Sequence, residues 1–202
     1  MEENAERVAA PRGGVGEPFF VLPVEPHPGT RNSKRPTHET FPLPRSGRDR
    51  ARVSTIEKNF RVGREPKDRA IFGFSMGGYL APTIGLNHPE IFGWVAGAST
   101  AGFRGEGTPN KNFKPLEAQL ELGKKNFKFI GFTVGTGSDA GGTAGNKGAV
   151  DYLTGLGLNV EWSQPPGGMH AWHSWRGYFR DLMADKFFVE HPYATAKVGM
   201  TK

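Results

Sequence analysis

A serine between two glycines is the first candidate for chemistry in this sequence. Residues 73–77 are Gly-Phe-Ser-Met-Gly, the pattern G-x-S-x-G, and they follow the apolar run Arg69–Phe74. At a strand-to-helix junction this pattern puts the serine on a sharp, strained turn, where larger residues at the glycine positions would collide with the strand and helix. The hydroxyl of Ser75 is then exposed as a nucleophile, and the amide of Met76 faces a developing oxyanion. A glycine-rich turn with an incidental serine would also fit.

A nucleophilic serine needs a base, and the base needs an acid that orients it. Asp139 follows the apolar run Phe127–Val134, so it is expected at the end of a strand; a turn or cap residue is the alternative, because Asp fills such positions readily. His170 and His173 follow the run Leu158–Ser163. The remaining histidines lie in the basic segment, after the helix that follows the serine, or in the tail: His27, His38, His88 and His191. By position, only His170 and His173 are expected to reach Ser75.

The same two histidines also have the spacing His-x-x-His, which suits a metal site on a helix. No nearby Cys, Asp or Glu completes such a site, and the chain contains no cysteine. The absence of cysteine also excludes disulfides, thiolate metal sites and a cysteine nucleophile. The sequence therefore predicts no metal and no cofactor.

The elements that must position these residues alternate between strand and helix. Strands are expected over Pro18–Val24, Arg69–Phe74, Ile91–Ala98, Phe127–Val134 and Leu158–Ser163. Helices are expected over Val53–Arg61, Met76–Asn87 with a kink at Pro82, Pro115–Lys125, Asn146–Leu156 and Ser174–Phe188. This alternation predicts an α/β fold with a mostly parallel sheet, whose carboxyl ends gather the active groups.

Chain length and net charge limit which other classes of protein the sequence fits. The 202 residues fit one domain, and the net charge of +6 is concentrated between residues 26 and 52, which carry seven basic and two acidic residues. That segment has five prolines and few apolar residues, so it is expected to be a loop or a disordered insert. It lacks aromatic interleaving, which argues against nucleic-acid binding. The sequence predicts no membrane span and no signal peptide.

Three segments together resemble the esterase family of the α/β-hydrolases, which includes feruloyl and acetylxylan esterases of carbohydrate esterase family 1, enterochelin esterases, S-formylglutathione hydrolases and mycolyltransferases. The resemblance covers roughly residues 53–190. Its blocks are 56–62 with 68–78 and 88–93, 134–139 (Val-Gly-Thr-Gly-Ser-Asp), and 167–176 (Gly-Gly-Met-His-Ala-Trp-His-Ser-Trp-Arg). The resemblance implies a three-layer sandwich with helices on both faces of the sheet. It also implies Ser75 as nucleophile, Asp139 as acid and His170 as base.

Two departures from the family affect this reading. Met169 is an extra residue between the glycine pair and His170, which keeps His173 open as the base. The family also has an upstream strand whose loop supplies a second oxyanion amide, and no such strand precedes residue 18. We therefore expect an N-terminal remnant over 1–17, a hydrolase domain over 18–190 that lacks its front strands and contains the insert 26–52, and a tail over 191–202.

The resemblance implies a feruloyl esterase-like serine hydrolase of carboxylic esters that forms an acyl-enzyme. The expected substrate is a small-molecule or polysaccharide-linked ester, bound by Phe74 and Trp172, with the Met76 amide on the oxyanion. Trp172 and Trp175 would also fit a role in packing the last helix on the sheet. An inactive hydrolase relic and an acyltransferase with the same triad are the alternatives. The oligomeric state and the compartment stay open.

Overall fold

The computed structural model describes residues 19–21, 46–60, 62–100, 103 and 108–188. Their five strands are β1 (Phe19–Val21), β2 (Arg69–Phe74), β3 (Trp94–Ala98), β4 (Phe129–Thr133) and β5 (Glu161–Ser163). The strands form one sheet in the order β1-β2-β3-β4-β5, and every neighbouring pair is parallel. All their carboxyl ends therefore meet at one edge, which is the edge where active groups gather in such sheets.

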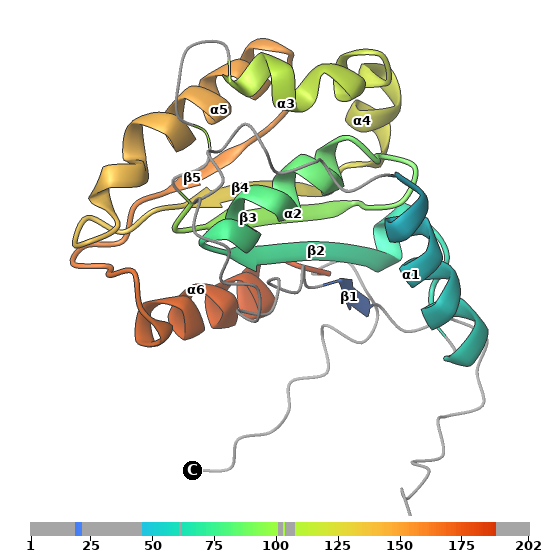
Figure 1. Cartoon of the computed structure of the whole chain (residues 1–202), viewed down its shortest axis with the longest axis horizontal. Helices are drawn as coiled ribbons and strands as arrows, with labels where there is room; N and C mark the ends of the chain where they lie inside the picture. Colours follow the sequence, from blue (N-terminus) through green and yellow to red (C-terminus); the bar gives the residue numbers. More distant parts are fainter. Residues whose placement is uncertain (1–18, 22–45, 61, 101–102, 104–107, 189–202) are drawn as a thin grey trace, which may run out of the picture.

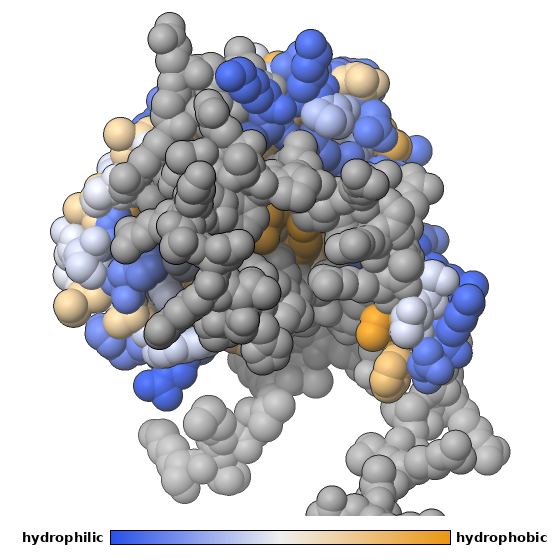
Figure 2. Space-filling model, viewed as in Figure 1, coloured by the Kyte–Doolittle hydropathy of each residue, from blue (hydrophilic) through white to orange (hydrophobic). Residues whose placement is uncertain are grey.

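Helices cover both faces of this sheet. They are α1 (Ser46–Asn59), α2 (Met76–Leu86), α3 (Thr108–Glu117), α4 (Leu120–Asn126), α5 (Thr143–Gly155) and α6 (Trp172–Asp185). In Figure 1, helices α2 to α5 lie on one side of the sheet and α6 lies on the other. Figure 2 shows mostly hydrophilic residues along the upper rim of this view, where Figure 1 places α3 and α4. The predicted α/β fold with helices on both faces is confirmed.

The pleat of the strands divides the apolar residues between two cores. Successive side chains of a strand point to opposite faces, so Ile71 and Phe72 of β2 belong to different clusters. Ile71 packs in the cluster that includes Ile84 of α2 and Leu153 of α5. Phe72 packs in the cluster that includes Leu182 of α6. Because both faces are covered, the central strands are buried along their length, which is why they appear in the sequence as continuous apolar runs.

Most predicted elements are present, with differences at their ends. Strand β2 has the predicted bounds, whereas β3 begins three residues late because the amides of Ile91 and Phe92 bond to the carbonyl of His88 in a turn. Helix α2 runs through Pro82 from Met76 to Leu86. Proline has no amide hydrogen, so this helix lacks one of its internal hydrogen bonds.

One predicted helix is two helices in the structure. The sequence predicts a single helix over Pro115–Lys125, but α3 ends at Glu117 and α4 begins at Leu120. Between them Gln119 has φ −125° and ψ 21°, which is not a helical conformation. Its amide donates to the carbonyl of Leu116 and closes the turn.

The sequence predicts a loop or disordered insert over residues 26–52, and this prediction is wrong for the last seven of them. Helix α1 begins at Ser46, and its following turns bury Val53 in the core and pack Ile56 against it. Arginine is a good helix former, so a basic segment that carries an apolar stripe into the core can be helical. Residues 26–45 of the predicted insert, the predicted N-terminal segment 1–17 and the predicted tail 191–202 lie outside the described residues. None of the helices in the described part has the length and apolar character of a membrane span.

Candidate active site

Ser75 lies at the carboxyl end of β2, on the turn into α2. Its φ of 53° and ψ of −117° are unusual for a residue other than glycine. The amide of Ser75 donates to the carbonyl of Ala98 at 3.0 Å, so the sheet still holds the residue after β2 has ended. Non-glycine residues with such conformations concentrate at functional sites, where the surrounding structure stabilises them.

The glycines around this turn differ in how much space the structure leaves for a side chain. A Cβ on Gly73 would lie 2.2 Å from the carbonyl oxygen of Gly77, and a Cβ on Gly78 would lie 2.3 Å from the carbonyl oxygen of Ala98. A Cβ on Gly77 meets nothing within 4 Å. The steric reason predicted for both glycines of the motif therefore holds for Gly73 and is wrong for Gly77. The close approach of α2 to β3 instead depends on Gly78.

The predicted serine, histidine and aspartate lie within hydrogen-bond distance of one another. His170 Nε2 is 2.9 Å from Ser75 Oγ, and His170 Nδ1 is 2.8 Å from Asp139 Oδ1. The Asp139 carboxylate is fully buried, whereas the His170 side chain is 43% exposed. A carboxylate can only accept, so Nδ1 carries the proton and Nε2 presents its lone pair to the serine. This arrangement can deprotonate Ser75.

The loop after β5 holds His170 through its backbone. The His170 amide donates to Ser138 Oγ at 2.8 Å, and the Met169 amide donates to Ser174 Oγ at 2.9 Å. The side chain of the extra residue Met169 points outward and is 46% exposed. His173 is exposed on the first turn of α6, and the side chains of Ser75 and Asp139 instead bond to His170 and, for Asp139, also to Ser99.

The second carboxylate oxygen of Asp139 has a partner that the sequence analysis missed. Asp139 Oδ2 lies 2.5 Å from the hydroxyl of Ser99, which in turn lies 2.9 Å from Nε1 of Trp175. Ser99 directly follows β3, so the rule that active groups gather after strands could have selected it. Nearby, burial and the negative charge of Asp139 raise the pKa of Tyr178, which therefore stays protonated at neutral pH.

The amide of Met76 begins α2 beside the candidate nucleophile. The first amides of a helix have no intrahelical partner and carry a partial positive charge, so they can stabilise an anion there. The segment upstream of residue 19, where the family's second oxyanion amide would be sought, lies outside the described residues.

Aromatic side chains surround the serine and histidine. The ring of Phe74 stacks on Trp175 at 5.3 Å and meets Trp172 edge-on at 6.4 Å. Trp175 is partly buried in the core beneath α6, as predicted for packing of the last helix, and its ring meets that of His170 at 5.0 Å. Trp172 is 69% exposed, so most of its surface is free to contact a ligand.

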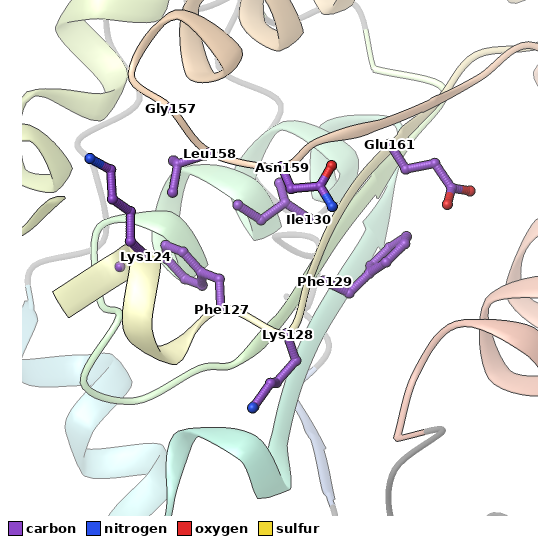
Figure 3. Close-up of a pocket in the computed structure, with 10 residues that line it drawn as sticks. Lys124, Phe127, Lys128, Phe129, Ile130, Gly157, Leu158, Asn159 and Glu161 are labelled. Carbon is purple, nitrogen blue, oxygen red and sulfur yellow. The ribbon is translucent and has the colours of Figure 1, made fainter. Parts of the chain in front are cut away.

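A separate cavity of 410 Å³ lies at the opposite edge of the sheet (Figure 3). Its lining includes Phe127 and Leu158, which precede β4 and β5, and Phe129 and Glu161, the first residues of those strands. Since parallel strands place Ser75 and His170 at their carboxyl ends, this cavity is not part of the candidate active site. Among the described residues, no three His, Cys, Asp or Glu side chains are close enough to hold a metal ion.

Comparison with known families agrees with this fold. The family described as "Putative esterase" matches residues 53–187, and the chain belongs to this esterase family. No curated protein matches the sequence.

Several solved structures have a similar fold at low sequence identity. A fluorophosphonate-binding serine hydrolase of Staphylococcus aureus matches with a TM-score of 0.54 and 16% identity, over 66% of this chain and 60% of that one. An S-formylglutathione hydrolase of the same species matches with a TM-score of 0.50 and 16% identity, over 71% of this chain and 66% of that one. A feruloyl esterase module of Clostridium thermocellum, complexed with sinapinate, matches with a TM-score of 0.54 and 17% identity, over 64% and 52%. The match therefore spans between half and two thirds of these solved chains.

Proposed function

We propose that this protein hydrolyses carboxylic esters with Ser75 as nucleophile, His170 as general base and Asp139 as the acid that orients it. The observation that carries the proposal is the continuous hydrogen-bonded chain from Ser75 Oγ through His170 to the buried Asp139, with lengths of 2.9 and 2.8 Å. Membership in the esterase family supports the reaction class.

The proposed reaction has two halves. His170 Nε2 takes the proton of Ser75 while Oγ bonds to the acyl carbon, and the carbonyl oxygen becomes an oxyanion that the Met76 amide stabilises. The carbonyl then reforms, the bond to the alcohol oxygen breaks, and His170 gives its proton to the leaving alcohol. A water molecule repeats these steps on the acyl-enzyme, which releases the acid and restores Ser75.

Asp139 supports His170 in both halves. Its Oδ1 accepts the hydrogen of Nδ1, which keeps Nε2 available as the basic nitrogen, and its negative charge stabilises the imidazolium that forms during attack. Its burial strengthens this interaction, because the side chain has no exposed surface on which water could screen the charge.

We also propose that the acyl group is aromatic and contacts Phe74 and Trp172. Phe74 precedes the nucleophile in the sequence, and its edge-on contact with Trp172 brings the exposed indole to the same side of the site. A flat ring can stack on such a surface. The sinapinate bound to the feruloyl esterase module is an acid of this kind. Methyl ferulate is therefore the substrate to test beside a simple acetate.

Two assays test the proposal with the full chain. The wild type is expected to hydrolyse p-nitrophenyl acetate and methyl ferulate, and to take up one equivalent of a fluorophosphonate probe on Ser75, located by mass spectrometry. Ser75→Ala should abolish the labelling and lower turnover by several orders of magnitude. Equal turnover by the two proteins would refute the nucleophile, and a folded wild type without labelling or turnover would favour an inactive relic.

A further inference from the structure

A buried serine outside the proposed triad contacts its acid. Ser99 is 4% exposed, and its Oγ lies 2.5 Å from Asp139 Oδ2. The other carboxylate oxygen, Oδ1, is 2.8 Å from His170 Nδ1. Each oxygen of Asp139 therefore has its own partner, so the carboxylate cannot rotate without breaking a hydrogen bond.

Trp175 determines which way the Ser99 hydroxyl donates. Its Nε1 lies 2.9 Å from Ser99 Oγ, and an indole N–H can only donate. Ser99 Oγ accepts this bond, and an ionised carboxylate accepts only, so the hydroxyl hydrogen of Ser99 goes to Asp139. The polar chain therefore runs from Trp175 on α6 through Ser99 to Asp139.

The backbone holds Ser99 in a conformation that a serine adopts only under constraint. Its φ is 56°, in the left-handed region, and its amide donates to the carbonyl of Thr133 on β4 at 2.8 Å. The next carbonyl, of Thr100, accepts from the buried side chain of Asn146 on α5 at 2.6 Å. Such strain persists where surrounding contacts over-determine the conformation, as β4 and α5 do here.

We infer that Ser99 and Trp175 are positioning residues that orient the Asp139 carboxylate toward His170. This inference rests on the proposed function. The hydrogen bonds of the two side chains lead to Asp139: Ser99 donates to it directly, and Trp175 donates to Ser99. Trp175 has a second contact that can help to hold the base, since its ring lies edge-on to the imidazole of His170 with the ring centroids 5.0 Å apart.

This role has a signature in the pH dependence. Without the Ser99 donor, the Asp139 carboxylate loses a charge-assisted hydrogen bond, so more of its negative charge acts on His170. The expected outcome is a shift of the acid limb of kcat/KM to higher pH. Among the described residues, the charge of Asp139 also acts on Tyr178 of α6, whose pKa is raised by burial and by that charge. Tyr178 is therefore neutral throughout this limb.

The test compares Ser99→Ala and Ser99→Gly with wild type in hydrolysis of p-nitrophenyl acetate over a pH series. Both variants should lower kcat about ten- to hundredfold, the size expected for one hydrogen bond to a charged group, with KM changed less than about twofold. Both should move the acid limb to higher pH. The glycine variant relieves the positive φ, so equal losses in the two variants assign the effect to the hydroxyl.

Trp175→Phe keeps an aromatic ring against Phe74 and removes the donor to Ser99. It should lower kcat about three- to tenfold and move the limb in the same direction. Arg180→Ala, on the exposed part of the same helix, is the control and should stay within about twofold of wild type. If thermal melting shows that the Ser99 variants do not fold, the result for Trp175→Phe decides whether the inference holds.

If the wild type is active and the variants keep its kcat and its acid limb, the inference is overturned and the proposed function stays intact. A lower rate with an unmoved limb would also overturn it, because general loosening of the site lowers the rate at every pH. A folded wild type that neither hydrolyses the ester nor reacts with the fluorophosphonate would instead refute the proposed function, and the inference with it.

Discussion

Ser75 and Ser99 occupy equivalent positions on neighbouring strands. The last residues of β2 and β3 are partners in the sheet register, and the serine that follows each has a positive φ, 53° for Ser75 and 56° for Ser99. Ser75 lies at one end of the hydrogen-bonded chain and Ser99 lies on the far side of Asp139. Two adjacent parallel strands thus deliver both serines to the same edge of the sheet.

The two histidines that the sequence could not separate by spacing should differ in mutants. His170→Ala should lower turnover of p-nitrophenyl acetate by several orders of magnitude, because it removes the group that contacts both Ser75 and Asp139. His173→Ala, exposed on α6, should change it by less than about tenfold. Steady-state kinetics of the two variants give the order, and the reverse order would make His173 the base.

Trp172→Ala should separate aromatic from simple esters. Loss of an exposed indole beside Phe74 should raise KM for methyl ferulate by about tenfold, the size of one aromatic contact, and leave p-nitrophenyl acetate within about twofold. Trp172→Phe is the matched control and should retain most of the preference. Equal effects on both esters would show that Trp172 has no part in binding the acyl group.

Two adjacent glycines of α2 should respond oppositely to alanine. Gly78→Ala places a Cβ 2.3 Å from the backbone of β3 and should lower the free energy of unfolding by about 1–3 kcal/mol or more. Gly77→Ala meets nothing within 4 Å and should leave it unchanged or raise it by up to about 1 kcal/mol, because alanine is the better helix former. Urea denaturation measures both. A more stable Gly78→Ala would contradict the close packing of α2 on β3.

A buried ion pair should matter more than an exposed one. Arg69 at the start of β2 contacts Glu57 of α1, and their side chains are 7% and 24% exposed. Glu57→Gln should lower the free energy of unfolding by about 1–3 kcal/mol, because a largely buried guanidinium loses one of its charged partners. Asp151→Asn breaks the exposed pair with Lys147 and should cost less than about 0.5 kcal/mol. Thermal or urea unfolding measures both variants. Equal losses in the free energy of unfolding would show that the Arg69–Glu57 pair stabilises the fold no more than the exposed pair does.

The strands that carry the candidate site could be predicted because their signals are local. Arg69–Phe74 is apolar, ends at a glycine-flanked serine and is buried on both faces, so its bounds in the sequence and in the structure agree. The ends of α3 and α4 could not be predicted in the same way. The break at Gln119 depends on the backbone path between two helices and leaves no distinctive residue in the sequence. The start of α1 was missed because its charges, and the prolines that precede it in the sequence, suggested a loop.

The sequence alone determined which residue types are present at the strand ends, and so which chemistry they can support: a serine on a tight turn, an aspartate and two histidines. Their spacing left His170 and His173 as equal candidates. Only the tertiary structure brings His170 to Ser75 across 95 residues of chain, and it does so through the backbone contact of its loop with Ser138. The partners of Ser99, Asp139 and Trp175, lie 40 and 76 residues away, so its contact with Asp139 depends on the pairing of β3 with β4 and its contact with Trp175 on the packing of α6 against the sheet. Local pattern determines the elements, but a hydrogen bond between distant side chains depends on how those elements pack.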